Sequence, residues 1–212
     1  DIVYACEKGF DFIAASFVRS KEDVLQIREI LKEHNSKIQI ISKIENQQGI
    51  DNLDEIVEAS YGVMVARGDL GVELPAEAIP NAQRRIVERC IAAKRPVIIA
   101  TQMLYSMVRS PRPTRAEVSD VASAICGRVD AVMLSDETAM GDFPVQSVET
   151  MARIAREIER DETHFKPMID MDMVSVNHEI TAQLARSAVR ASTNLPIKYV
   201  VLDTKTGRTG RY

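Results

Sequence analysis

The sequence predicts an α/β fold, a partial (β/α)8 TIM barrel followed by the start of a second α/β domain. Three observations favour this fold. Short apolar runs rich in Val and Ile recur along the chain, and such runs are typical of strands buried on both faces. Stretches with helical spacing separate the runs. Polar residues follow the ends of four successive runs, which is where barrels place their functional side chains.

Five apolar runs are predicted to be parallel strands. They are FDFIAASFV (10–18), IQIISKI (38–44), GVMVA (62–66), PVIIAT (96–101) and DAVMLS (130–135). Successive runs begin 24 to 34 residues apart, which is the length of a strand followed by a helix. We therefore expect parallel strands joined by right-handed crossovers.

Helices are predicted between these strands from the spacing of apolar residues. One apolar face consists of Val24, Ile27 and Leu31, and another of Ile86, Cys90 and Ala93. Ser20 is a candidate N-cap for the first helix. Thr114 and Glu117 have the spacing of a capping box, in which each side chain binds a backbone amide of the other residue.

The pattern changes after Gly141. A long helix is predicted from 144 to about 160, a second helix over 177–194, with Ile180, Leu184, Ala188 and Ala191 on one side, and a strand at KYVVLDT (198–204). We expect a boundary between 162 and 174, which gives a barrel domain over 1–161 and the start of another α/β domain over 174–212. Both ends are expected to continue into a longer protein, because the chain opens at Asp1 without an initiator Met.

Composition argues against several classes of protein. The 27 basic and 31 acidic side chains give a formal net charge of −4, which argues against binding to nucleic acid or a membrane surface. We find no signal peptide and no apolar run long enough to span a bilayer. The three cysteines form no C-x-x-C pair, so we expect buried thiols in a reducing, cytosolic compartment.

The distribution of polar residues favours a barrel over a doubly wound open sheet. An open sheet concentrates its site at one switch point, usually beside a glycine-rich first turn, and neither G-x-G-x-x-G nor G-x-x-x-x-G-K-[ST] occurs. Here four strand ends carry polar groups, namely Lys43 and Glu45, Arg67 to Asp69, Thr101 and Gln102, and Ser135 to Glu137.

These groups suggest phosphoryl-transfer chemistry. Glu45 and Asp69, at adjacent strand ends, are suited to Mg²⁺, which keeps waters and accepts substrate oxygens as further ligands. Lys43 points to the same side as Glu45, and its charge is tolerated there if an anionic substrate lies between the ammonium and the metal. Backbone amides at a tight GDLG turn from Gly68 are expected to bind an anion, and Thr101 offers a hydroxyl.

Each group also has a structural interpretation. Lys43 and Glu45 can form an ion pair without a catalytic role, Asp69 can form an Asx-turn, and Ser135 can cap a helix. His34, His164 and His178 lack the spacing of metal ligands. The coincidence of four neighbouring strand ends favours the functional interpretation.

The residues also resemble those of a known family. The segments IISKIEN, GVMVARGDLGVELP, ATQML, PRPTRAEVSDVA and MLSDETAMGDFP are similar, in unbroken order, to pyruvate kinase. The similarity runs from Asp1 to about Arg160, with weaker similarity in the C-terminal part. The resemblance implies a (β/α)8 barrel of which this chain supplies about the fourth to eighth strands. It also implies transfer of the phosphoryl group of phosphoenolpyruvate to ADP, giving pyruvate and ATP in the final step of glycolysis.

The resemblance implies a role for each site residue. Lys43 matches the lysine that stabilises the transferring phosphoryl group, and Glu45 and Asp69 match ligands of Mg²⁺ or Mn²⁺. Thr101 matches a catalytic position in the network that protonates the enolate. The substrate-binding positions that match are Lys43, Arg67, Gly68, Asp69, Thr101, Ser135 and Glu137.

Further expectations follow from the same resemblance. The protein is expected to be a cytoplasmic homotetramer, and K⁺ is a further cofactor whose ligands would lie outside this chain. The family pattern reads MLSGETA, whereas this chain has Asp136 in place of the glycine, an extra carboxylate near Ser135 and Glu137.

Two other functions stay open at the level of sequence. A Mg²⁺-dependent pyruvate or enolate lyase or aldolase would use the same two carboxylates without ADP, and the chain could be a non-catalytic module. We expect the isolated 212-residue polypeptide to be inactive, because five strands cannot close a barrel. The inward side chains Ile41, Val65, Ile99 and Met133 would then lack an opposing wall.

Overall fold

The computed structural model describes residues 1–160, 180–204 and 210. Two compact units make up the chain, Asp1–Lys166 and Pro167–Tyr212. The limits expected from the sequence, 161 and 174, fall outside the described residues, so the domain boundaries stay a prediction.

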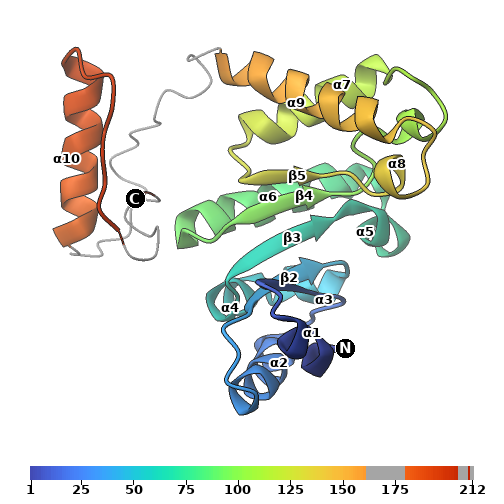
Figure 1. Ribbon diagram of the computed structural model, residues 1–212, viewed down its shortest axis with the longest axis horizontal. Helices are drawn as coiled ribbons and strands as arrows, with labels where there is room; N and C mark the ends of the chain where they lie inside the picture. The colour runs from blue at the N-terminus through green and yellow to red at the C-terminus, as the bar shows by residue number, and fades with distance from the viewer. Residues whose placement is uncertain (161–179, 205–209, 211–212) are drawn as a thin grey trace. The chain divides into compact units, whose positions relative to one another are not determined.

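The first unit is built on one parallel sheet (Figure 1). Its strands are β1 (Phe12–Ala15), β2 (Gln39–Ile44), β3 (Gly62–Ala66), β4 (Val97–Ala100) and β5 (Ala131–Met133). The spatial order β1-β2-β3-β4-β5 follows the chain without reversal, and every neighbouring pair is parallel. Right-handed crossovers in one direction put the connecting helices on one face, as in a barrel wall. All five strand predictions are confirmed, β3 with the predicted bounds and the other four with shorter bounds.

Helices of the first unit precede and follow the strands. They are α1 (Ile2–Lys8), α2 (Lys21–Glu33), α3 (Gln47–Asp51), α4 (Leu53–Ala59), α5 (Arg67–Glu73), α6 (Ile79–Ala93), α7 (Arg115–Cys126), α8 (Asp136–Ala139) and α9 (Pro144–Arg160). Short 3-10 turns occupy Ala76–Ala78 and Tyr105–Val108. Both predicted caps are confirmed, since Ser20 forms a capping box at α2 and Thr114 forms one with Glu117 at α7. Helix α2 packs on α4, α4 on α6, and α7 on α9.

The main core lies between the sheet and these helices. Ile44, Val65 and Ile99 are fully buried in it together with helix residues such as Ile56 and Ile86. Alternation along a strand turns neighbouring side chains to opposite faces. The interior face of the barrel wall therefore carries Ile41, Met64, Ile98 and Met133.

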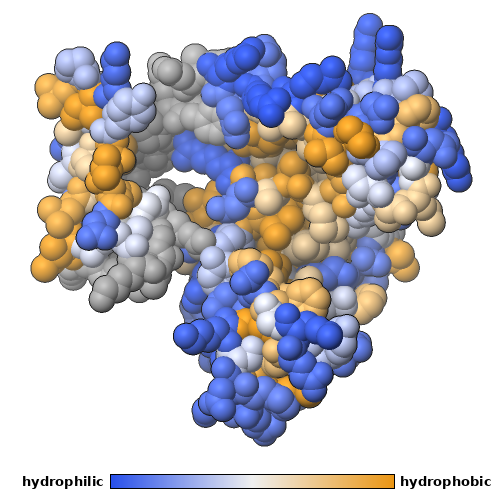
Figure 2. All heavy atoms as spheres, viewed as in Figure 1, coloured by the Kyte–Doolittle hydropathy of each residue, from blue (hydrophilic) through white to orange (hydrophobic). Residues whose placement is uncertain are grey.

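Two of the expected inward side chains are thus placed wrongly by the sequence prediction. Val65 and Ile99 are paired in register, as are Ile44 and Val65, and all three face the helices rather than the barrel interior. The two faces are both apolar in this sheet, so the sequence alone does not distinguish them. Figure 2 shows hydrophobic side chains gathered over the region of β3, β4 and β5.

The second unit contains α10 (Ile180–Asn194) among its described residues. The predicted helix over 177–194 is confirmed from residue 180, and residues 177–179 lie outside the described range. The strand predicted over 198–204 is wrong, because these residues have no regular structure. A strand requires a hydrogen-bonded neighbour, and Val201 is 93% exposed.

The three cysteines differ in burial. Cys90 is buried, but Cys6 and Cys126 are only partly buried, so the expectation of three buried thiols is wrong for two of them. Burial, with the negative charge of Asp130, raises the pKa of the Cys90 thiol to about 12, which keeps it protonated.

Among the residues that the structure describes, no helix has the length and apolar character needed to cross a membrane.

Candidate active site

Lys43 and Glu45 meet at the carboxyl end of β2. The Lys43 Nζ atom lies 2.5 Å from Glu45 Oε1, and the Glu45 side chain is only 1% exposed. Lys43 has 22% of its side chain exposed, so its ammonium lies between the buried carboxylate and solvent. The pair ends the apolar run as the sequence predicts, with both side chains on one side of the strand.

Two residues that follow β1 form hydrogen bonds with Lys43 and Glu45. Lys43 Nζ donates a hydrogen bond to Ser16 Oγ at 3.1 Å, and the amide of Phe17 donates to Glu45 Oε2. Phe17 has a φ of 52°, a left-handed conformation that is uncommon for a bulky residue. The strained backbone directs the amide toward the carboxylate, and such strain is concentrated at functional sites.

The ARGDLG segment forms a helix rather than the expected tight turn. Arg67 begins α5 directly after β3, and Asp69 lies in its first turn. Ile44 is paired in register with Val65, so Glu45 comes level with Ala66, the residue before α5. The carboxylates of Glu45 and Asp69 therefore come from the same end of adjacent strands. The alternative interpretation of Asp69 as an Asx-turn is wrong, because Asp69 lies in the first turn of this helix.

The Arg67 guanidinium holds the connection after β4. Its Nη1 atom donates to both carboxylate oxygens of Asp120 at 2.8 and 2.6 Å. Its Nη2 atom donates to the carbonyl of Thr101 at 2.8 Å and contacts Met103 Sδ at 2.8 Å. Arg67 is 9% exposed. These bonds direct the guanidinium into the protein, where it positions Thr101.

Thr101 has a strained backbone next to α5. Its φ is 69°, and that of Gln102 is 54°, although a β-branched residue strongly disfavours the left-handed region. The Thr101 hydroxyl donates to the carbonyl of Ala100 at 2.6 Å and accepts from the Gly68 amide at 2.8 Å. The Gly68 amide is therefore already bonded. Asp69 is the third residue of α5, and the amide at this position of a helix has no intrahelical partner.

Ser135 and Glu137 form a brace behind the site. Glu137 is fully buried, and its carboxylate oxygens accept from the amides of Leu104 at 3.0 Å and Ser135 at 2.8 Å. Ser135 occupies the N-cap position of α8 without a side-chain capping bond. The brace joins the connection after β4 to the end of β5. Its contacts fix backbone, so a direct substrate contact for either residue stays a prediction.

The oxygens at this end of the sheet fit a divalent cation. Glu45 Oε1 is buried and, among the described residues, accepts no hydrogen bond of ordinary geometry, although the Lys43 ammonium lies beside it. In the part of the chain that the structure describes, no group of three or more His, Cys, Asp or Glu side chains is arranged to hold a metal ion. Mg²⁺ needs only one or two carboxylates when waters and substrate supply its other ligands, and Glu45 with Asp69 meets this requirement.

Glu117 stabilises the same connection from α7. Its carboxylate accepts hydrogen bonds from the amide and hydroxyl of Ser106 and from the amide and hydroxyl of Thr114. Partial burial raises the pKa of Glu117, but these hydrogen bonds outweigh burial and leave the pKa below its ordinary value. The connection between β4 and α7 is thus fixed at Ser106, five residues after Thr101.

We expect Glu117→Gln to lower the melting temperature at neutral pH. A carboxyl whose pKa is lowered by folding adds stability above its unfolded pKa, and this stability is lost as pH falls through the folded pKa. The difference in melting temperature between wild type and variant should therefore shrink at acid pH. Glu159→Gln, on the exposed face of α9, is the matched control. An equal effect of both substitutions, or a difference that does not change with pH, would contradict this assignment.

Comparison with known proteins places this chain in a family. The family model described as pyruvate kinase, barrel domain, matches residues 1–148. The chain belongs to the pyruvate kinase family. A pyruvate kinase of Bacillus licheniformis is 53% identical over 212 residues, which are 100% of this chain and 36% of that protein. A pyruvate kinase of Dictyostelium discoideum is 50% identical over 215 residues, covering 100% of this chain and 42% of that protein.

A solved structure agrees with this assignment. The crystal structure of a pyruvate kinase from Cryptosporidium parvum matches with a TM-score of 0.92 and 42% identity, covering 99% of this chain and 44% of that one. The α/β fold with a parallel sheet is thus that of the pyruvate kinase barrel domain. The chain spans less than half the length of these relatives.

Three contributors to the candidate site escaped the sequence analysis. Ser16 directly follows β1, and the rule that polar residues follow strand ends would have found it. Asp120 lies 53 residues from Arg67, and its role depends on tertiary packing alone. The Phe17 amide is a backbone group, and a Phe side chain gives no sequence signal of a left-handed conformation.

Proposed function

We propose that this chain carries the phosphoryl-transfer site of a pyruvate kinase, which moves the phosphoryl group of phosphoenolpyruvate to ADP and yields pyruvate and ATP. The observation that carries the proposal is the Lys43 ammonium at the open end of β2, beside the buried Glu45 carboxylate. Family membership supports it. We further propose that β1 to β5 are about the fourth to eighth strands of the barrel.

Lys43 stabilises the transferring phosphoryl group in this proposal. Phosphoryl transfer depends on positioning and on positive charge around the group in flight, with little covalent work for the protein. The Lys43 ammonium lies 2.5 Å from the Glu45 carboxylate, and it also donates a hydrogen bond to the Ser16 hydroxyl. The ammonium is therefore oriented before the substrate arrives, which reduces the reorganisation needed in the transition state.

Thr101 takes part in protonating the enolate. Its hydroxyl is held between the Ala100 carbonyl and the Gly68 amide, so its position is fixed and it can pass a proton through water. Arg67 acts on this hydroxyl through the Thr101 carbonyl. The Asp69 amide in the first turn of α5, which has no intrahelical partner, is placed to bind the substrate carboxylate. Ser135 and Glu137 complete the substrate pocket by fixing its floor.

Glu45 and Asp69 would hold Mg²⁺ or Mn²⁺, with K⁺ as a further cofactor bound by other segments. A divalent cation supplies positive charge that neutralises the developing charge on phosphate and enolate oxygens. The buried Glu45 oxygen without an ordinary hydrogen bond supports this role.

The remaining proposals follow from the family. The intact protein is a cytoplasmic homotetramer of glycolysis that also binds ATP and pyruvate, and it has no nucleic-acid or membrane partner.

Turnover of phosphoenolpyruvate by the intact protein tests the reaction. With ADP and Mg²⁺ present, we expect phosphorus-31 NMR to show ATP appearing as phosphoenolpyruvate disappears, with no loss of phosphoenolpyruvate when ADP is omitted. A lyase or aldolase built on the same carboxylates would process pyruvate or its enolate without forming ATP. Consumption independent of ADP would therefore favour that class and contradict the proposal.

Binding of Mn²⁺ tests the metal ligands separately from turnover. We expect Glu45→Gln and Asp69→Asn each to weaken Mn²⁺ binding, because each removes a charged oxygen and keeps the shape of the side chain. Electron paramagnetic resonance of free Mn²⁺ gives the affinity directly. Asp51→Asn is the control, since Asp51 is bonded to Gln47 at the exposed surface. Unchanged affinity in both variants would assign Glu45 and Asp69 purely structural roles.

A further inference from the structure

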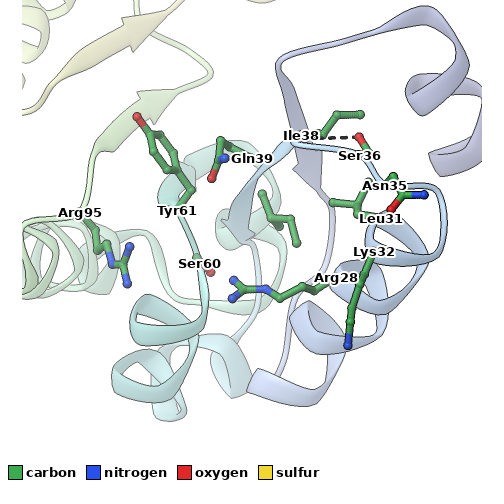
Figure 3. A pocket seen from close by; sticks show the side chains of 11 residues that line it. Arg28, Leu31, Lys32, Asn35, Ser36, Ile38, Gln39, Ser60, Tyr61 and Arg95 are labelled. Carbon is green, nitrogen blue, oxygen red and sulfur yellow. Dashed lines mark hydrogen bonds between the residues drawn. The ribbon is translucent and has the colours of Figure 1, made fainter. Parts of the chain in front are cut away.

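A hollow lies beside the residues that precede β2, β3 and β4 (Figure 3), whereas the candidate active site lies where these strands end. Its volume is about 480 Å³, and its lining includes Arg28, Leu31, Lys32, Ser60, Tyr61 and Arg95. Ser60 and Tyr61 come just before β3, and Arg95 comes shortly before β4. The six residues of β2 span roughly 20 Å at about 3.3 Å per residue, so the hollow is separate from Lys43 and Glu45.

The charge of this hollow has one sign. Three of its eleven lining residues are cationic and none is acidic. Figure 3 shows the guanidinium groups of Arg28 and Arg95 on either side of Ser60, whereas Lys32 points away from them. Glu29 lies 3.9 Å from Lys32, so it offsets the charge of that lining residue, whereas Glu58 lies 3.7 Å from Arg89, which is outside the lining.

Capping of α4 explains only part of this charge. Arg28 donates to the carbonyl of Ala59, and Arg95 donates to the carbonyl of Glu58 at 3.1 Å, so both bind the last turn of α4. A helix C-terminus carries at most about half of a negative charge. Two guanidinium groups bring two positive charges and have further N–H donors beyond these bonds. An excess of positive charge and donors therefore remains around Ser60.

The rest of the lining is suited to an organic group. Leu31, Ile38 and Ile40 are buried apolar residues of the hollow, and the Tyr61 ring lies at its edge (Figure 3). The volume is in the range of small-molecule sites and exceeds what an inorganic anion fills. Arginine pairs present the fork geometry that matches phosphate oxygens.

We propose that this hollow binds a small organic phosphate. The phosphoryl oxygens lie between Arg28 and Arg95, and the carbon part lies against Leu31, Ile38 and Tyr61. The site is independent of the proposed reaction, since none of the residues assigned to phosphoryl transfer lines it.

Binding of inorganic phosphate to the intact protein tests the proposal. All proteins in this experiment carry Lys43→Met as a background substitution, which removes the cation of the candidate active site. Phosphate replaces chloride at constant ionic strength. Calorimetry should show saturable phosphate binding, weakened at least about tenfold in Arg28→Gln/Arg95→Gln, because two charged donors are lost. Glutamine keeps an N–H for the α4 carbonyls. Lys32→Gln, an equal change of charge on a side chain that points away, should bind phosphate like the background protein.

Crystals of the unsubstituted protein give a test that does not depend on folding of the variants. Tungstate is a tetrahedral oxyanion with a strong anomalous signal, and we expect a peak between Arg28 and Arg95 after soaking. Absence of this peak would overturn the proposal, as would phosphate binding that is undetectable or equal in the background protein and the double variant.

Discussion

Substitution of Lys43 by Met lowers the turnover number of the intact protein by about two powers of ten or more, the scale of one preorganised electrostatic contribution. The ammonium is the positive charge at the open end of β2, and Met fills a similar volume without charge. The expected loss falls on the turnover number at saturating substrate, because the ammonium acts most strongly on charge that develops in the transition state. A coupled assay of pyruvate formation measures it.

The structure adds a consequence for stability that the sequence did not suggest. Lys43 is the ion-pair partner of a carboxylate that is 1% exposed, and removal of one partner of such a pair is destabilising. The variant should be assayed well below its melting temperature. Lys37→Met, at an exposed position before β2, is the matched control and should keep normal turnover. Near-normal turnover of a folded Lys43→Met protein would exclude the proposed role.

The substitution Glu137→Met should destabilise the barrel domain by about 2 to 6 kcal/mol. It removes the acceptor of two backbone amides, those of Leu104 and Ser135, and each buried unsatisfied donor costs about 1–3 kcal/mol. The loss should be concentrated where the brace acts. We expect faster hydrogen exchange at Leu104 and Ser135, with a lower melting temperature of the whole protein.

A matched pair of variants separates this brace from a general effect of charge. Glu137→Gln keeps one carbonyl acceptor but presents an NH₂ group to the other amide, so its loss of stability should be intermediate. Asp136→Asn changes a neighbouring charge that is only partly buried and should leave exchange at Leu104 unchanged. If Glu137→Met exchanged as slowly as the wild type at both amides, the brace would be excluded.

The fold could be predicted where local pattern and burial agree. The run of Val, Met and Ala that ends at Ala66 is a strand whose five residues are all buried, as is typical of a strand covered on both faces. The same pattern misled the prediction at residues 198–204, where Val201 is 93% exposed and the described residues provide no neighbouring strand. Strand formation there depends on a pairing partner, which a local pattern does not contain.

The site shows the same division between local and tertiary information. Alternation along β2 was enough to put Lys43 and Glu45 on one side. The bonds from Arg67 to Asp120 and Thr101 cross 53 and 34 residues of sequence, so they could not be derived from spacing. The left-handed conformation of Thr101 was likewise hidden, because its φ of 69° opposes the preference of the residue type. Inactivity of the isolated 212-residue polypeptide stays a prediction.

A crystal structure of the intact protein with Mn²⁺ and oxalate tests the central claim most directly. Oxalate is a planar dianion with the shape of the pyruvate enolate, and Mn²⁺ is located by its anomalous scattering. We predict the Mn²⁺ peak between the carboxylates of Glu45 and Asp69, with oxalate against the first turn of α5 and near the Thr101 hydroxyl. A fully occupied Mn²⁺–oxalate complex bound away from the ends of β2 and β3 would contradict the proposed site.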